Sequence, residues 1–269
     1  MLAEDRARAI VELVRRDGFQ AIDALALQFG VTPQTIRRDV NLLCDRGLLR
    51  RRHGGVELPP EGENLAYPAR QVLNIDAKRR IAQLVEREVP EGASLFFGIG
   101  TTPEQCALAL ADHSGLRVMT NNLNVALAFS RNTSCEITVA GGRLRNLDRD
   151  VVAGDAHGFF SRFAVDIGIY GVGGVAEDGT LLDFSTDEVA MRSELAQHCR
   201  RRFLVLDHSK FGRGATVRGG HVTEANAVFT DRPVPAAIAD QLREAGVRLV
   251  SWSDDIASMA IASQTKRRG

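Results

Sequence analysis

Residues 31–43 have the sequence VTPQTIRRDVNLL, which predicts a helix that begins at Thr32 and Pro33. A threonine side chain can cap the first backbone N–H groups of a helix, and proline fits at the first helical position because its missing N–H costs nothing there. With about 100° between successive residues, the apolar side chains share one face and must pack against a core. They are Ile36, Val40 and Leu43. The opposite face is polar and carries Gln34, Arg37, Arg38 and Asn41.

The flanking sequence places this helix in a larger motif. Apolar spacing predicts helices over about residues 6–16 and 22–29, and residues 48–56, LLRRRHGGV, predict two short strands joined by a glycine turn. Arg and Gln side chains can read base edges, and a basic wing can contact phosphate. A polar helix face or a basic triplet alone is more often solvated charge, but their combination indicates a winged helix-turn-helix that binds operator DNA. The predicted DNA contacts are Thr32, Gln34, Thr35, Arg37, Arg38, Asn41, Arg50, Arg51, Arg52 and His53.

Composition and charge limit the number of domains and the classes of protein that this sequence can represent. The chain has 269 residues, 44% of them hydrophobic, and a formal net charge of zero, which suits two folded domains. Residues 1–56 contain ten Arg and no Lys against seven Asp and Glu, a mild basic excess. The N-terminus predicts an amphipathic helix rather than a signal peptide, and no apolar run is long enough to cross a bilayer. We therefore expect a cytoplasmic protein without a membrane partner.

The cysteines are Cys44, Cys106, Cys135 and Cys199, which are too far apart in sequence to form a CxxC pair or a typical zinc site. We expect reduced, buried thiols, no metal and no cofactor.

Proline and acidic residues follow the wing and suggest a linker. The predicted organisation is a DNA-binding domain over residues 1–57, a linker over 58–74, an α/β domain over 75–255 and a flexible tail over 256–269. Short apolar strands alternate with helices in the second domain, which indicates a mostly parallel sheet. The strands are expected at 94–97, 117–120, 136–140, 165–170, 203–206, 228–230 and 248–250.

In open parallel sheets, ligands bind beyond the carboxyl ends of the strands. Residues 98–103, GIGTTP, follow the first predicted strand and could present backbone N–H groups and two hydroxyls to a phosphate at a helix N-terminus. They match neither GxGxxG nor the P-loop motif. Each such loop alone is as well explained by a structural role, but several converge at strand ends. The predicted effector contacts are Gly100, Thr101, Thr102, Asn121, Asn122, Gly141, Gly142, Asp183, Glu188, Asp207 and Lys210.

Several motifs carry a family resemblance over about residues 5–250. VTPQTIRRD at 31–39 and RHGG at 52–55, with GTTPE at 100–104, TNNLNVA at 120–126 and DHSKFGR at 207–213, resemble the DeoR family of bacterial repressors. Two positions differ from the family pattern, Gly98 where aspartate is common and Ser193 where a second basic residue is common.

The resemblance implies a winged helix-turn-helix joined to a sensor domain like ribose-5-phosphate isomerase. It also implies a homo-oligomeric repressor, dimer or tetramer, of a carbon-catabolism operon. A small phosphorylated metabolite, glycerol 3-phosphate above others, would release it from the operator.

Two other classes of function stay open at this point. A sugar-phosphate isomerase with an appended DNA reader would use Asp183 or Glu188 as base and Lys210 to hold negative charge. A DNA-binding protein without a ligand is the third class, and the many polar strand-end loops argue against it.

Overall fold

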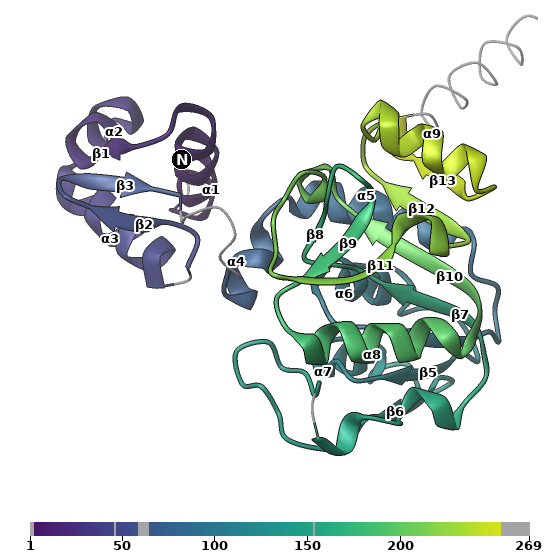
Figure 1. Ribbon diagram of the computed structural model, residues 1–269. Helices are drawn as coiled ribbons and strands as arrows, with labels where there is room; N and C mark the ends of the chain where they lie inside the picture. The colour runs from purple at the N-terminus through teal and green to yellow at the C-terminus, as the bar shows by residue number, and fades with distance from the viewer. Residues whose placement is uncertain (1–2, 46, 59–64, 153, 254–269) are drawn as a thin grey trace, which may run out of the picture. The chain divides into compact units, whose positions relative to one another are not determined.

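The computed structural model describes residues 3–45, 47–58, 65–152 and 154–253. The chain divides into two compact units, residues 1–73 and 74–269 (Figure 1). No helix in the described ranges is long and apolar enough to cross a membrane.

The first unit packs three helices against a small antiparallel sheet. The helices are α1 (Ala3–Asp17), α2 (Ile22–Phe29) and α3 (Pro33–Asp45). The strands are β1 (Gln20–Ala21), β2 (Arg50–Arg52) and β3 (Gly55–Glu57), in the order β1-β3-β2. Ile36, Val40 and Leu43 of α3 are buried in the shared core, as their spacing predicts. These elements form the predicted winged helix-turn-helix.

The segment predicted as a linker contains a helix that the sequence analysis missed. Helix α4 (Tyr67–Val72) lies within residues 58–74, and both Tyr67 and Ala69 are buried. Ala69 belongs to the core of the first unit. The two prolines at 59 and 60 suggested an unpacked chain, but the apolar side chains that follow them give this part of the segment a surface to bury. Residues 59–64 and the predicted tail, 256–269, lie outside the described residues.

The second unit is built on a parallel sheet of seven strands among the described residues. They are β4 (Ser94–Phe97), β5 (Arg117–Thr120), β6 (Glu136–Val139), β7 (Val165–Tyr170), β10 (Cys199–Leu206), β12 (Ala227–Thr230) and β13 (Arg248–Ser251). Their order is β13-β12-β10-β7-β4-β5-β6, and every pair is parallel. The expected strands and the parallel α/β fold class are confirmed.

Helices cover both faces of this sheet (Figure 1). They are α5 (Ile75–Glu86), α6 (Thr101–Ala109), α7 (Leu123–Phe129), α8 (Thr186–Gln197) and α9 (Ala236–Glu244). Successive side chains of a strand point to opposite faces. Leu95 and Phe97 therefore join the core under α5, α6 and α7, whereas Phe96 joins the core under α8 and α9.

Short elements complete the unit. The 3-10 turns are η1 (Gly154–Ala156), η2 (Phe160–Arg162), η3 (His208–Lys210) and η4 (Val222–Glu224). A second sheet, in the order β11-β9-β8, joins β8 (Gly174–Val175), β9 (Thr180–Asp183) and β11 (Val217–His221) in antiparallel pairs. No pattern in the sequence predicted this sheet. It places Asp183 at the end of β9.

All four cysteines, which lie in the described ranges, are free thiols. Cys106 is buried as expected, whereas Cys44, Cys135 and Cys199 are partly exposed. Burial raises the pKa of the Cys199 thiol to about 11, which keeps that thiol protonated at neutral pH.

Candidate DNA-binding surface and effector pocket

The exposed face of α3 carries the polar side chains expected of a recognition helix. Gln34, Arg37, Arg38 and Asn41 are exposed, and Thr35 is half-buried. Thr32 Oγ1 accepts a hydrogen bond from Thr35 N at 3.2 Å, so it caps the helix. Arg6 of α1 pairs with Asp39 of α3 at 2.6 Å. This nearly buried ion pair fixes α3 against α1, which leaves the polar face of α3 outward.

The wing divides its three arginines between two sides of strand β2. Arg50 and Arg52 each pair with Glu57 of β3, at 2.7 and 2.8 Å. Arg51 points to the other side and donates a hydrogen bond to Asn41 Oδ1 on α3. His53 is exposed in the turn, where Gly54 has a φ of 78° that glycine adopts without strain.

Helix and wing together form a basic groove. Its lining includes Arg37 and Asn41 from α3, Arg51 and Arg52 from the wing, and Asp23 from α2, around about 650 Å³ of open space. Four of the ten predicted DNA contacts, two from α3 and two from the wing, therefore meet at one surface.

A second cavity, of about 300 Å³ including its open mouth, lies at the carboxyl ends of the central strands of the large sheet. Most of its lining is apolar and includes Ile99 after β4, Phe160 of η2, and Met191 and Leu195 of α8. The polar side chains in the lining are Asn121 after β5, Tyr170 at the end of β7, and Asp183, Glu188 and Arg192 from β9 and α8. Three predicted effector contacts, Asn121, Asp183 and Glu188, thus line one cavity.

Two arginines hold the carboxylates of this cavity in place. Arg192 pairs with Asp183 at 2.9 Å, and Gly173 N donates to the same carboxylate at 2.8 Å. Arg145 NH1 lies 2.9 Å from Glu188 Oε1, and its Nε lies 2.6 Å from Asp150 Oδ1. Burial raises the pKa of Asp183 and of Asp150 above the usual range, although Arg192 and Arg145 act in the opposite direction. Asp150, Arg145 and Glu188 therefore form one ion-paired group, and Asp183 and Arg192 form another.

The asparagines of residues 121–124 hold the loop that carries Arg145. Asn121 Nδ2 donates to Val151 O at 2.8 Å, and Asn124 Nδ2 donates to Asp148 O at 3.2 Å. Two backbone bonds, from Leu123 N to Arg149 O and from Val151 N to Asn121 O, fix the same loop. The run TNNLN at 120–124, which contains the two predicted effector contacts Asn121 and Asn122, therefore has a structural role.

The strand-end glycine loop begins helix α6 beside the cavity. Gly100 precedes the helix with a φ of 116°, a conformation that L side chains rarely adopt, and Thr101 and Thr102 are buried in the first turn. Gly98 and Ile99, the two residues before Gly100, line the cavity itself. The first turn of α6 is thus joined to the cavity wall.

Gly141 and Gly142 are exposed beyond the end of β6 and lie outside the described lining of the cavity. These two glycines were predicted as effector contacts because they also follow the end of a strand. However, β6 is the edge strand of the sheet, two strands away from β4.

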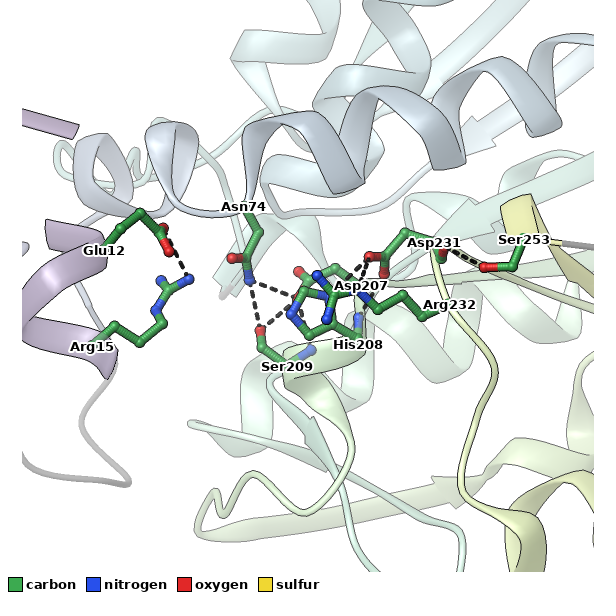
Figure 2. Close-up of polar contacts among 9 residues, drawn as sticks. All are labelled: Glu12, Arg15, Asn74, Asp207, His208, Ser209, Asp231, Arg232 and Ser253. Carbon is green, nitrogen blue, oxygen red and sulfur yellow. Dashed lines mark hydrogen bonds and ion pairs between the residues drawn. The ribbon is translucent and has the colours of Figure 1, made fainter. Parts of the chain in front are cut away.

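Asp207 belongs to a polar cluster at the end of β10 (Figure 2), and Lys210 follows it in the turn η3. Both residues lie outside that lining. Asp207 Oδ1 accepts hydrogen bonds from Asn74 Nδ2 and from Ser209 N, both at 3.0 Å. Burial would raise the pKa of Asp207, but Lys210, Lys78 and the bonds from Ser209 outweigh it and lower this pKa. Next to it, both backbone N and Nδ1 of His208 contact the Asp231 carboxylate, at 2.8 and 2.9 Å.

Arg145, Asp150 and Arg192 were not among the predicted site residues. The Arg145–Glu188 pair spans 43 positions in the sequence, so no local motif marks it. In a sequence, an arginine in a loop that forms a buried ion pair cannot be distinguished from one that is solvated.

Comparisons with known proteins agree with both units. The family model "DeoR-like helix-turn-helix domain" matches residues 6–61, and "DeoR C terminal sensor domain" matches residues 73–232. The Glycerol-3-phosphate regulon repressor of Escherichia coli (strain K12) is 40% identical over 249 residues, covering 93% of this chain and 99% of the relative. The repressor of the same name from Haemophilus influenzae is 41% identical over 245 residues, 91% of this chain and 95% of the relative.

Among solved structures, the chain is similar to ribose 5-phosphate isomerase A from Methanocaldococcus jannaschii. The TM-score is 0.38 with 14% identity, over 51% of this chain and 55% of that one. A likeness of this size has no bearing on function.

Proposed function

The chain belongs to the DeoR family of DNA-binding transcriptional repressors, and we propose that glycerol 3-phosphate is the metabolite that releases it from its operator. The observation that carries the choice of site is the cavity of Asn121, Asp183, Glu188 and Arg192, which adjoins the first turn of α6 at the strand ends.

The DNA-binding surface would be the groove between α3 and the wing. Gln34, Arg37 and Arg38 are exposed on α3, where they could read base edges in the major groove. The exposed wing arginines would contact phosphates and so contribute affinity more than sequence preference. Arg51 differs from Arg50 and Arg52, because its bond to Asn41 also positions a side chain of the recognition helix.

The effector would lie with its phosphate at the first turn of α6 and its hydroxyls in the cavity. Free backbone N–H groups and the dipole at a helix N-terminus favour an anion, and Thr101 and Thr102 add hydroxyl groups there. Asp207 and Lys210 would contact the effector from the end of β10, outside the cavity.

Release from DNA would follow from the coupling of two binding equilibria. An effector that binds more tightly to a state with low operator affinity shifts the protein toward that state. We propose a homo-oligomer, dimer or tetramer, because several readers on one operator multiply affinity and a rearrangement of subunits can break the fit. It would act in the cytoplasm on a carbon-catabolism operon.

We propose sensing rather than catalysis for the cavity. Both candidate bases are held by arginines, Asp183 by Arg192 and Glu188 by Arg145, so neither carboxylate can approach a substrate carbon without breaking its ion pair. An NMR time course with ribose 5-phosphate or a triose phosphate should show no product above background. Turnover of about 1 per second or faster, within the usual enzyme range, would contradict this part of the proposal.

The main test measures operator affinity and stability together. An operator is first selected from random duplexes with the purified protein, and fluorescence anisotropy then gives its Kd with and without ligand. Glycerol 3-phosphate should weaken operator binding and raise Tm, whereas glycerol should do neither because it lacks the phosphate. Arg38→Ala should weaken operator binding without changing the Tm shift. Equal effects of glycerol and glycerol 3-phosphate would contradict the proposed effector.

A further inference from the structure

The side-chain amide of Asn41 is held by an arginine of the wing. Asn41 is exposed on α3, and its Oδ1 accepts a hydrogen bond from Nη2 of Arg51 on strand β2. A guanidinium has only N–H donors, so the amide atom that faces it must be the oxygen. The contact therefore fixes the orientation of the amide and leaves the two N–H groups of Nδ2 for another partner.

Arg51 also acts on a second residue of α3. Cys44 follows Asn41 by three positions, so the two side chains lie on the same side of the helix. Burial raises the pKa of the Cys44 thiol, whereas Arg51 opposes this rise through its charge and a hydrogen bond. The other two arginines of β2 pair instead with Glu57 of β3. Arg51 is thus the wing arginine that is fixed to the recognition helix at two points.

Asn41 and Arg51 lie side by side in the lining of the basic groove. Both are exposed, so a base edge that enters the groove can reach them. The lining also contains Arg37, Arg52 and one carboxylate, that of Asp23. Hydrogen-bond donors therefore outnumber acceptors among the charged and amide groups of this groove.

The engaged oxygen changes which base Asn41 can read. An asparagine reads adenine with both amide atoms, donating to N7 and accepting from the N6 amino group. Although Oδ1 has a second lone pair, an amino group that approached it would lie beside the positive charge of Arg51. Guanine instead offers two acceptors, O6 and N7, on its major-groove edge. The donors of Asn41 and Arg51 match these two acceptors.

We propose that Asn41 and Arg51 act as one donor unit that selects guanine over adenine at the base pair they contact. This inference rests on the proposed DNA-binding surface and adds the base that this part of it prefers. Arg51 determines specificity through the orientation that it gives to Asn41. The other two arginines of β2 contribute positive charge without selecting a base.

Binding to altered operators tests this preference. A selected operator is varied one base pair at a time, and the position whose preference disappears in Asn41→Ala is the one that Asn41 contacts. The wild type should prefer guanine to adenine there by about tenfold, the effect of one good pair of hydrogen bonds. Fluorescence anisotropy gives each Kd. A preference for adenine, or the absence of any position that depends on Asn41, would overturn the inference.

A modified base tests the donor unit in the wild-type protein itself. Replacing the contacted guanine with 7-deazaguanine removes the N7 acceptor and keeps the base pair. Binding should weaken by about tenfold for the wild type and by less than twofold for Asn41→Ala. An equal loss in both proteins would mean that other side chains read this guanine, and would overturn the inference.

Arg51→Met tests whether Arg51 sets the orientation of Asn41. Methionine keeps an unbranched side chain but donates no hydrogen bond, so the amide oxygen becomes available and the preference for guanine over adenine should fall to about one or reverse. Arg50→Met is the matched control, because it removes an equal charge from the same strand on the side that faces Glu57. The control should weaken binding to all duplexes alike and retain the preference. An unchanged preference in Arg51→Met would overturn the role of Arg51.

The outcome is separable from that of the proposed function. If guanine is preferred but glycerol 3-phosphate does not release the operator, the proposed effector is wrong and the inference holds. If neither Asn41→Ala nor Arg38→Ala changes operator binding, the proposed DNA-binding surface and the inference are both wrong. The 7-deazaguanine series with the wild type decides the donor unit should Arg51→Met fail to fold.

Discussion

Glu57 is an acidic residue in the middle of a basic wing. It accepts ion pairs from Arg50 and Arg52, and its pKa is lowered by the hydrogen bonds that these two side chains donate. Glu57 therefore stays ionised and offsets part of the positive charge that a DNA phosphate would meet. Because of Glu57, the net charge of the wing is less positive than its three arginines alone would give.

Removing this charge should strengthen DNA binding. We expect Glu57→Gln to bind non-specific duplex about two- to fivefold more tightly, with the gain shrinking as salt is added, because exposed charges are screened. Fluorescence anisotropy at several salt concentrations measures the Kd for the duplex. Glu12→Gln is the control, since it removes an equal charge from α1, where Glu12 pairs with Arg15. Equal gains in both variants would indicate a net-charge effect rather than a wing effect.

Asp207 should make stability depend on pH in the acid range. Its pKa in the folded protein lies below the usual value, so its contribution is present above the unfolded pKa of about 4 and is lost as pH falls through the folded pKa. We expect Asp207→Asn to lower the free energy of unfolding by about 2 kcal/mol at pH 7, since charged hydrogen-bond partners are lost.

Denaturant unfolding of wild type and Asp207→Asn between pH 7 and pH 3.5 checks whether the pKa of Asp207 is lowered in the folded protein. The difference between the two proteins should stay constant down to about pH 4 and shrink below it. A difference that already vanishes near pH 6 would mean that the pKa of Asp207 is raised.

At the scale of elements, the loop after β6 depends on Arg145 and on residues 121–124. Arg145 is 30% exposed and joins Asp150 of its own loop to Glu188 of α8. Replacing it leaves two buried carboxylates without their main partner. We expect Arg145→Gln to destabilise the protein by about 1–3 kcal/mol, less than for a fully buried pair because solvent screens Arg145. Limited proteolysis should cut residues 141–151 faster.

Arg143→Gln is the matched control for this prediction. Arg143 lies in the same loop and is exposed, so the same change of charge should leave stability and cleavage nearly unaltered. If both variants are cleaved equally fast, the loop is held by its backbone bonds alone.

Elements with a strong apolar pattern could be predicted from sequence, and elements defined by tertiary contacts could not. Strands β4 and β7 and the second half of β10, residues 203–206, are buried and mostly apolar, and α3 has a clear apolar face. The strands β8 and β11 instead contain Gly174, Gly219 and Gly220, which suggest turns. Gly174 is required there because a Cβ would clash with the backbone of Arg213.

The residues of the candidate site also divide into those that a local sequence pattern predicts and those that depend on tertiary contacts. Asn121 belongs to the family motif TNNLNVA, and the strand that ends at Asp183 was not predicted. The rule that ligands bind at strand ends located the loop before α6, because that rule needs only the strands. It also included Gly141 and Gly142, because a sequence does not give the order of strands in a sheet. The partners Arg145 and Arg192 depend on how β9 and α8 pack against the sheet, which no local pattern encodes.

For the whole molecule, the residue at which the second unit begins has an unusual backbone and specific partners. Asn74 follows Leu73, the last residue of the first unit, and has a φ of 53°. Its Nδ2 lies 3.0 Å from Asp207 Oδ1 and 3.0 Å from Ser209 Oγ, as Figure 2 shows. The start of the second unit is thus hydrogen-bonded to the end of strand β10.

This connection predicts a variant that binds effector but responds to it poorly. Glycine adopts a positive φ readily, so Asn74→Gly keeps the backbone and removes only the side-chain bonds. We expect the Kd for glycerol 3-phosphate in the absence of DNA to stay within about twofold, while the factor by which it weakens operator binding falls by about tenfold, within the usual range of coupling energies. Asn226→Gly, which removes an asparagine bond to Arg202 N at 2.9 Å elsewhere in the same unit, should retain the full response. A full response in Asn74→Gly would show that the effector signal reaches the DNA-binding unit by another route.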